Sequence, residues 1–244
     1  MEDFPDSSHA LEDPNGLLAV GGDLSADRLL LAYSRGIFPW YGEGDPILWW
    51  TPDPRCVLFP DEFKISKTLR KTMKSNSFSL TWNKAFAAVM EGCAGPRSDG
   101  EGTWIDENMA SAYQRLHRLG YAHSVDVWQQ DTLVGGLYGV ALGSCFFGES
   151  MFHRVTEASK VALAGLVWRA RATDINLIDC QVSSDHLFSL GARNLPREHF
   201  ENLLARAIKR VGTGEKAEAA MAAVTGFPVT STILSEIKGE GGNA

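Results

Sequence analysis

The sequence predicts an α+β fold in which a small N-terminal domain precedes a larger domain built on a mixed sheet. The 244 residues are 44% hydrophobic and 22% charged, which is enough apolar material for a packed core. Residues 123–152 contain three strand-like runs separated by short turns, which is typical of an antiparallel meander. A helical pattern at residues 157–171 then leads into an apolar run at 175–182, and such crossovers join parallel strands.

The N-terminal domain is predicted to contain little regular structure. Residues 1–13 are polar and irregular, and a turn at 14–16 leads into an extended segment at 17–20. Ser25 is a suitable N-cap for a helix that continues to Arg35 and ends at Gly36. Prolines are dense at residues 51–60 and indicate a domain boundary. We therefore predict domains at residues 1–56 and 57–211 and a C-terminal extension at 212–244, with residues 239–244 disordered.

The larger domain is predicted to combine the meander with several helices. Helices are expected at residues 64–74, 81–93, 106–119, 157–171, 185–190 and 196–210, with Asp106 as the cap of the third and Pro196 in the first turn of the last. Strands are expected at residues 124–129, 133–141, 145–152 and 175–182.

The helix at residues 64–74 has one apolar and one basic face. Ile65, Leu69 and Met73 recur every four residues and form the predicted buried stripe. The chain has a net charge of −7, so any contact with nucleic acid must come from a local basic patch. Such a face is also compatible with simple solvation. The candidate phosphate-binding residues are Lys64, Lys67, Arg70, Lys71 and Lys74.

Aromatic side chains are concentrated at residues 37–50, and Trp40 is one of them. Because every nucleobase has a face that stacks on indole, this group is a candidate stacking platform. The alternative is a core built from loop aromatics.

Two acidic residues lie in otherwise apolar strands. Asp179 is in the strand at 175–182, where alternation places Gln181 on the same face. Glu149 is in the strand at 145–152. A buried carboxylate is costly unless it is paired or used, so the two acids suggest a negatively charged cleft for a cationic substrate. The alternatives are that Asp179 caps a neighbouring loop and that Glu149 pairs with Arg154 or another local cation.

The remaining composition gives no sign of a metal, a cofactor or a membrane segment. The cysteines lie far apart, which predicts reduced thiols in a cytoplasmic protein. The histidines form no ligand pattern, so a metal hydrolase is disfavoured. No run approaches the roughly 18 apolar residues of a membrane span, and the acidic N-terminus lacks an apolar signal core.

Six motifs, in order along the chain, resemble the leucyl/phenylalanyl-tRNA–protein transferase family. The resemblance extends from about residue 14 to residue 200 and does not cover the segment after residue 211. The motifs are GLLAVGGDL at 16–24, RGIFPW at 35–40, LWWTPDPR at 48–55, GTWI at 102–105, GESMF at 148–152 and LIDCQ at 177–181.

The resemblance implies an acetyltransferase-like (GNAT) fold for the larger domain. It implies transfer of Leu, Phe or less often Met from aminoacyl-tRNA to proteins that begin with Arg or Lys, which marks them for degradation by the N-end rule pathway. No cofactor is implied, and we expect a monomer.

The resemblance also implies roles for particular residues. Asp179 is expected to act electrostatically or as proton acceptor, Gln181 to orient the amine, and Glu149 to bind the acceptor N-terminus. The residues expected to hold the terminal adenosine of the tRNA are Trp40 and Trp104, and those of the aminoacyl side-chain pocket are Leu137, Phe146 and Leu163. The family has methionine at the position of Leu137.

Two other functions are compatible with parts of the pattern. An acyl-CoA N-acyltransferase would share the fold, but it needs a glycine-rich turn before the crossover helix, and residues 152–157 contain no glycine. A noncatalytic module that binds aminoacyl-tRNA or a degron would not need both Asp179 and Gln181.

Overall fold

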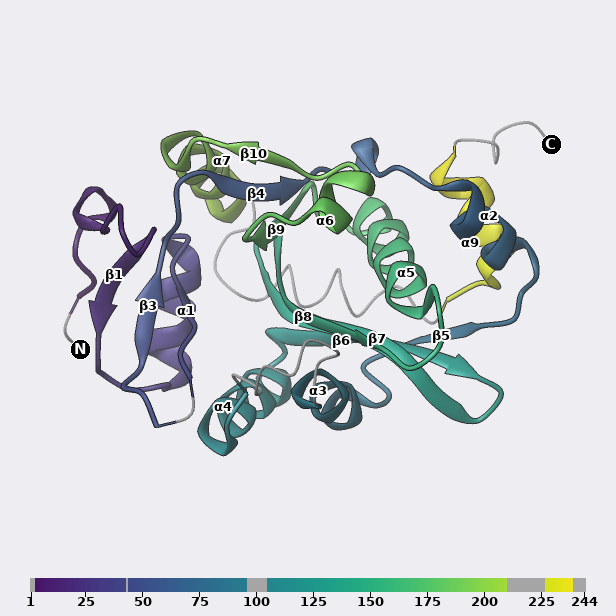
Figure 1. Cartoon of the computed structure of the whole chain (residues 1–244), viewed down its shortest axis with the longest axis horizontal. Coiled ribbons are helices and arrows are strands. Elements are labelled where there is room, and N and C mark those ends of the chain that lie inside the picture. The colour runs from purple at the N-terminus through teal and green to yellow at the C-terminus, as the bar shows by residue number, and fades with distance from the viewer. Residues whose placement is uncertain (1–2, 43, 96–104, 210–226, 239–244) are drawn as a thin grey trace.

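The computed structural model describes residues 3–42, 44–95, 105–209 and 227–238 and contains two sheets. The smaller sheet has the order β1-β3-β2, with β1 at Leu17–Val20, β2 at Phe38–Pro39 and β3 at Leu48–Trp50. Helix α1 (Ala26–Ser34) lies beside it (Figure 1). These elements, together with the short helix η1 (Ser7–His9), form the N-terminal part of the molecule.

The larger sheet has seven strands in the order β10-β4-β9-β8-β7-β6-β5. Strands β6 to β8 form the antiparallel meander that the sequence predicts, and β8 pairs in parallel with β9, also as predicted. Strand β5, which was not predicted, extends the meander by pairing with β6. The strands are β4 (Arg55–Leu58), β5 (Ser79–Trp82), β6 (Ala122–Gln129), β7 (Thr132–Leu142), β8 (Cys145–His153), β9 (Leu177–Gln181) and β10 (Arg193–Leu195).

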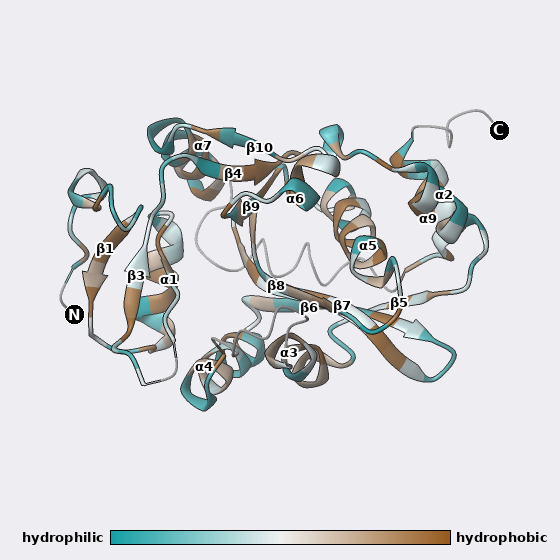
Figure 2. Ribbon diagram, in the orientation of Figure 1, coloured by the Kyte–Doolittle hydropathy of each residue, from teal (hydrophilic) through white to brown (hydrophobic). Residues whose placement is uncertain are grey.

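Helices cover both faces of the larger sheet. Helices α3 (Phe86–Ala94) and α4 (Glu107–Arg118) lie on one side of β6–β8 and the crossover helix α5 (Ala158–Ala172) on the other (Figure 1). The others are η2 (Pro60–Glu62), α2 (Lys67–Lys74), α6 (Asp185–Ser189), α7 (Arg197–Lys209) and α9 (Thr230–Ile237). The sheet strands and the buried face of α5 are strongly hydrophobic (Figure 2). In the described residues, no helix has the length and apolar character needed to cross a membrane.

Several helix boundaries follow directly from capping chemistry. The side chains of Ser25, Ser66 and Asp106 each accept a hydrogen bond from the backbone N–H three residues later, at the starts of α1, α2 and α4. Gly36 ends the α1 segment with φ of +73°, a conformation that glycine adopts without strain. The predictions for α1 and α4 are confirmed. Helix α2 begins at Lys67, so Lys64 precedes it.

The prediction of one helix at residues 81–93 is wrong. Thr81 and Trp82 belong to β5, which pairs with β6, and α3 begins only at Phe86. The buried Asp126 on β6 explains the break, because its carboxylate accepts hydrogen bonds from the Thr81 hydroxyl and from the backbone N–H of Lys84. These bonds hold residues 81–84 against the sheet. Sequence patterns alone do not reveal this long-range partner.

Strands β4 and β10 were not predicted. The proline-rich segment at 51–60 contains β4, which lies between β9 and β10 in the larger sheet. The side chains of β4 are buried throughout, including Arg55. The segment interpreted as a domain boundary therefore also contains a strand in the interior of the larger sheet.

Candidate active site

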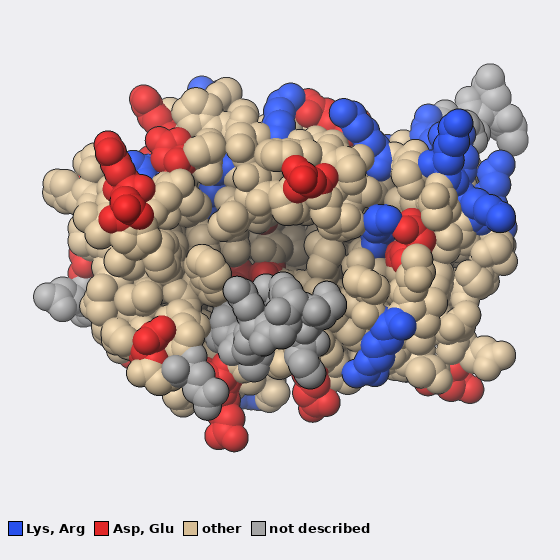
Figure 3. All heavy atoms as spheres, viewed as in Figure 1, with Lys and Arg blue, Asp and Glu red and all other residues tan. Residues whose placement is uncertain are grey.

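A cavity of about 260 Å³ opens between the larger sheet and helices α5 and α6. Figure 3 shows a hollow near the centre of the surface. Most of the wall is apolar, and the one carboxylate among the described lining residues is that of Glu149. The lining residues are Leu137, Tyr138, Gly148, Glu149, Ser150, Met151, Leu163, Leu166, Ile178, Cys180, Ser184, His186 and Leu187.

Glu149 is the extra residue of a β-bulge in β8. In the pairing of β7 with β8, Gly139 is opposite Gly148 and Tyr138 is opposite Ser150, which leaves Glu149 without a partner. The bulge also changes the alternation of the strand. Phe146 and Met151 are five residues apart, yet both pack in the core beneath α5, which a regular strand would not allow.

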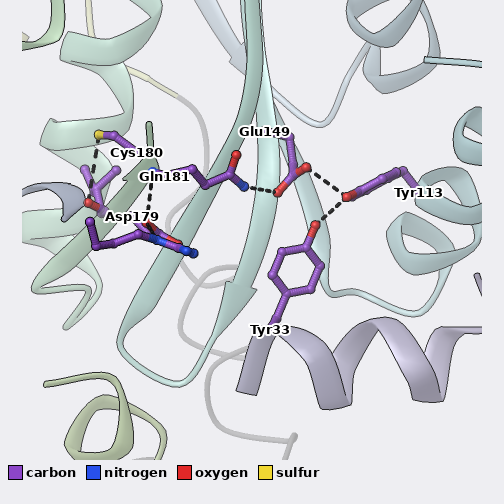
Figure 4. Close-up of polar contacts among 8 residues, drawn as sticks. Tyr33, Tyr113, Glu149, Asp179, Cys180 and Gln181 are labelled. Carbon is purple, nitrogen blue, oxygen red and sulfur yellow. Dashed lines mark hydrogen bonds and ion pairs between the residues drawn. The ribbon is translucent and has the colours of Figure 1, made fainter. Parts of the chain in front are cut away.

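A chain of hydrogen bonds holds the Glu149 carboxylate (Figure 4). Its Oε1 accepts from Gln181 Nε2 at 2.8 Å, and its Oε2 accepts from the Tyr113 hydroxyl at 2.8 Å. Since the Tyr113 proton is used in this bond, the contact between the Tyr33 and Tyr113 hydroxyls has Tyr33 as the donor. The side chains come from α1, α4, β8 and β9, so the site joins both parts of the molecule.

Burial raises the pKa of Glu149 to about 7, and the charge of Asp179 acts in the same direction. The hydrogen bonds from the tyrosines and from Gln181 oppose this shift. Burial also raises the pKa of Tyr33 and of Tyr113 well above the ordinary value, so both remain protonated donors near neutral pH. Because its own pKa is about 7, Glu149 can gain or lose a proton near neutral pH.

Asp179 forms a fully buried ion pair with Arg55 of β4. Arg55 Nε donates to Oδ1 at 2.8 Å and Nη2 donates to Oδ2 at 2.6 Å, a bidentate arrangement. Both side chains have 0% exposure. The Arg55 guanidinium also lies over the rings of Phe38 and Phe200, at 4.8 and 4.7 Å from their centroids. Asp179 is thus paired within the sheet rather than capping a loop.

Gln181 departs from regular strand geometry. Its φ of +63° is in the left-handed region, which costs energy for a residue with a side chain. Its backbone N–H donates to Asp179 Oδ1 at 2.9 Å, and its amide reaches Glu149. The simple alternation used in the sequence analysis therefore does not describe Gln181. Asp179 instead fixes the backbone from which Gln181 extends.

The predicted side-chain pocket coincides in part with this cavity. Leu137 and Leu163 line it, whereas Phe146 is fully buried in the adjoining core. A Cβ at Gly139 would lie 2.5 Å from the Phe146 ring, so glycine leaves room for this ring beneath the pocket. The sequence analysis did not identify four further apolar lining residues, namely Met151, Leu166, Ile178 and Leu187.

The predicted tRNA-contacting residues are not among the described residues that line the cavity. Trp40 is 47% exposed and its ring lies 5.7 Å from that of Trp50. Trp104 lies outside the described residues. The cations at positions 64, 67, 70, 71 and 74 are all exposed. Lys and Arg side chains gather over α2 in Figure 3.

Glu149 bonds to Tyr113 and Gln181, and no ion pair with Arg154 is formed.

Sequence reasoning missed Arg55, Tyr33 and Tyr113. For Arg55, the signal was available: a carboxylate in a buried strand needs a cation, and Arg55 opens a short apolar run. The two tyrosines gave no comparable signal, because they lie on separate helices and meet only through the fold.

Comparison with known proteins places this chain in a family. A model of the leucyl/phenylalanyl-tRNA protein transferase matches residues 57–205, and the model of its N-terminal domain matches residues 22–53. The chain belongs to the leucyl/phenylalanyl-tRNA–protein transferase family. As a member, it is an aminoacyltransferase that uses aminoacyl-tRNA and protein substrates.

Curated leucyl/phenylalanyl-tRNA–protein transferases align with most of the chain. The one from Stutzerimonas stutzeri is 58% identical over 207 residues, which are 85% of this chain and 92% of the relative. The one from Cellvibrio japonicus is 56% identical over 202 residues, 83% of this chain and 86% of the relative. A solved structure of L-PGS from Bacillus licheniformis covers 66% of this chain and 52% of its own, with 10% identity and a TM-score of 0.39, too distant to bear on the fold.

Proposed function

We propose that this transferase moves Leu or Phe, and less often Met, from aminoacyl-tRNA to the α-amine of proteins that begin with Arg or Lys. The product would be a substrate for N-end rule degradation. The observation that carries the proposal is the cavity itself, whose walls, as far as the structure describes them, are mostly apolar and contain one carboxylate, that of Glu149. The walls suit an apolar aminoacyl side chain and the acid suits a cationic N-terminus.

The donor side chain is assigned to the apolar part of the cavity. Leu137 and Leu163 form part of its wall, with Phe146 supporting them from the core. Such pockets discriminate by only about 1–3 kcal/mol per methylene, so acceptance of Leu, Phe and Met by one site is expected. Ile and Val branch at Cβ, close to the reacting carbonyl group, and should be poor donors.

The acceptor amine is assigned to Glu149. Its carboxylate already accepts bonds from Gln181 and Tyr113, which fix its position at the cavity. A cationic N-terminus that approaches Glu149 is attracted by its negative charge. This attraction is stronger in a partly desolvated site than in water. Replacing Glu149 by Lys should abolish use of peptides that begin with Arg, measured with an otherwise identical peptide series.

The chemistry requires an unprotonated amine. The amine attacks the ester carbonyl, a tetrahedral intermediate forms, and the tRNA terminal hydroxyl leaves with a proton. Most of the rate gain comes from holding donor and acceptor together, up to about 7–11 kcal/mol. Both Asp179 oxygens are bound to Arg55, so we assign Asp179 to positioning and electrostatics. Glu149, with a pKa near neutrality, is the better proton acceptor, and Gln181 orients the amine.

The tRNA is assigned to two surfaces. Trp40 and Trp104 are proposed to stack on the terminal adenosine, each contact contributing about 1–3 kcal/mol. The exposed cations of α2 and Lys64 are proposed to bind phosphates of the tRNA body.

We also propose that the larger part is a GNAT-type domain, on the basis of its meander, its crossover helix α5 and the parallel pair β8–β9. The proposed domain limits remain 1–56 and 57–211, although β4 begins at Arg55 and belongs wholly to the larger sheet. We also propose that the protein is a monomer and that it is located in the cytoplasm.

An acyl-CoA donor is disfavoured at the start of α5. The residue before this helix is Glu157, whose carboxylate pairs with Lys160. A carboxylate there repels a pyrophosphate. Calorimetry with acetyl-CoA should therefore show no binding.

The deciding experiment measures transfer of radiolabelled Phe or Leu from charged tRNA to two peptides that differ only in their first residue, Arg or Ala. Label should enter the Arg peptide and not the Ala peptide. Equal labelling of the two peptides, or none of either, would refute the proposal.

A further inference from the structure

Helix α9 (Thr230–Ile237) lies beyond residue 205, where the match to the catalytic family model ends. It packs against α5 and α2 and is seen beside α2 at one end of the molecule (Figure 1). Its side chains Ile233, Leu234 and Ile237 have exposures of only 0%, 3% and 6%. This part of the C-terminal extension therefore contributes to the core.

Helix α2 rests mainly on α9 and touches α5 less. Its apolar residues Leu69 and Met73 are fully buried in the core that also contains the apolar face of α9. The opposite face of α2 carries the exposed cations. Without α9, the apolar side of α2 would lose much of its packing surface, and an isolated helix of eight residues is not stable in water.

Hydrogen bonds connect the two ends of α9 to different helices. At its start, the Thr230 hydroxyl donates to the Met73 carbonyl at 2.9 Å, and the Ser231 N–H donates to Asn76 Oδ1 at 2.9 Å. At its end, Arg171 Nη1 donates to the Ile237 carbonyl at 2.6 Å, and Trp168 bonds to Glu236. Met73 lies in the last turn of α2 and Asn76 follows the end of that helix, whereas Trp168 and Arg171 belong to α5.

The same α5 forms a wall of the aminoacyl cavity through Leu163 and Leu166. We propose that α9 is a positioning element that fixes the basic face of α2 relative to this cavity, so that the cations meet the phosphates of the tRNA body while the aminoacyl end occupies the pocket. The inference rests on the proposed function. It gives the extension a role in binding the tRNA body and none in the transfer step.

The test compares two variants that introduce the same charge, one within α9 and one at the residue that precedes it. Ile233→Asp places a carboxylate at a fully buried position, and Val229→Asp places one at a position that is 59% exposed. Each is assayed with Phe-tRNA and with a minimal donor, a phenylalanyl ester of adenosine, which lacks the tRNA body. Thr230→Val, which removes only the hydroxyl bonded to Met73, is the milder variant and decides the case if Ile233→Asp does not fold.

Ile233→Asp should raise the Kd for Phe-tRNA about tenfold and flatten its salt dependence, because several phosphate contacts are lost. Thr230→Val should produce a smaller change of the same kind. Both should use the minimal donor within about twofold of wild type, and Val229→Asp should match wild type with both donors. Unchanged tRNA binding in both core variants, or equal losses with the two donors, would overturn the role of α9. Failure of the wild-type protein with both donors would instead refute the proposed function.

Discussion

At the scale of single residues, the site depends on two carboxylates in different states. Asp179 is buried and paired bidentately with Arg55, whereas Glu149 lines a cavity and is bonded by neutral donors. The first forms an ion pair with its partner. The second has its pKa raised to about 7 by burial. One fold thus gives two acids distinct roles through their surroundings.

Replacing Asp179 by Asn should remove the partner of a buried guanidinium. We expect the free energy of unfolding in urea to fall by about 3–5 kcal/mol, because Arg55 is left as an uncompensated buried charge. The double replacement Arg55→Met with Asp179→Leu should recover part of this loss. Asp185→Asn, at an exposed carboxylate, is the control. A loss in Asp179→Asn no larger than in the control would contradict the assignment.

Glu149→Gln tests the raised pKa of the cavity carboxyl. The folded protein keeps a proton on Glu149 up to about pH 7, whereas the unfolded chain releases it near the ordinary value of 4.5. Between these values the folded state binds more protons, so wild-type stability decreases as pH rises through this window. The Gln variant cannot titrate and should lack this decrease.

Urea midpoints of wild type and Glu149→Gln, measured from about pH 5 to pH 8, check this expectation. As pH rises, the urea midpoint of wild type should fall relative to that of Glu149→Gln. Parallel pH profiles would show that Glu149 does not carry a raised pKa.

At the scale of elements, α2 and α5 present the two predicted substrate surfaces. Helix α2 separates its buried Leu69 and Met73 from its exposed cations. Helix α5 is buried over most of its length and turns Leu163 toward the cavity. Helix α2 can therefore be altered on its exposed basic face while its packing face is left intact, whereas a change at Leu163 of α5 alters both the cavity and the adjoining core.

Replacing Lys67, Lys71 and Lys74 together by Ala should weaken tRNA binding in low salt. Loss of three phosphate contacts should reduce the slope of log K against log salt by about 2. Lys84→Ala, at an exposed lysine near Trp128, is the matched control. Binding measured over a salt series would contradict the patch assignment if the triple variant kept the wild-type slope.

Leu163→Ala should enlarge the cavity on its α5 side. We expect the ratio of kcat/KM for Phe-tRNA to that for Leu-tRNA to rise about tenfold, in line with the discrimination an apolar pocket provides. Leu116→Ala removes the same side chain from α4, on the other face of the sheet, and should leave this ratio unchanged. An equal shift in both variants would place the donor pocket elsewhere.

At the scale of the whole molecule, one apolar core includes residues of both sheets. It contains Trp49 of the smaller sheet and Phe147 and Tyr138 of the larger one. Tyr33 of α1 packs on Phe147, with ring centroids 5.0 Å apart, and bonds to Tyr113 of α4. The proposed domains therefore share core packing as well as the site.

Unfolding should accordingly be a single cooperative transition. Tryptophan fluorescence and far-UV circular dichroism, followed in the same urea titration, should give coincident curves. Two separated transitions would mean that the N-terminal part folds independently.

Much of this architecture was predictable because its signals are local. The meander, the crossover helix and the caps at Ser25 and Asp106 follow from alternation, periodicity and capping chemistry. The identities of Asp179, Gln181 and Glu149 as candidates also came from sequence. Their geometry did not: Arg55 lies 124 positions from Asp179, and the pairing depends on β4 entering the sheet beside β9.

The bulge at Glu149 ties the site to the exact length of one strand. Deleting Glu149 would restore regular pairing with Ser150 still opposite Tyr138 and Met151 still opposite Leu137, so the later side chains would keep their side while the acid was lost from the cavity. Natural variation in this enzyme should then tolerate exchanges in the strand far better than insertions or deletions. The place of Glu149 at the cavity thus depends on β8 having one residue more than the stretch of β7 that it pairs with, as well as on the residue type.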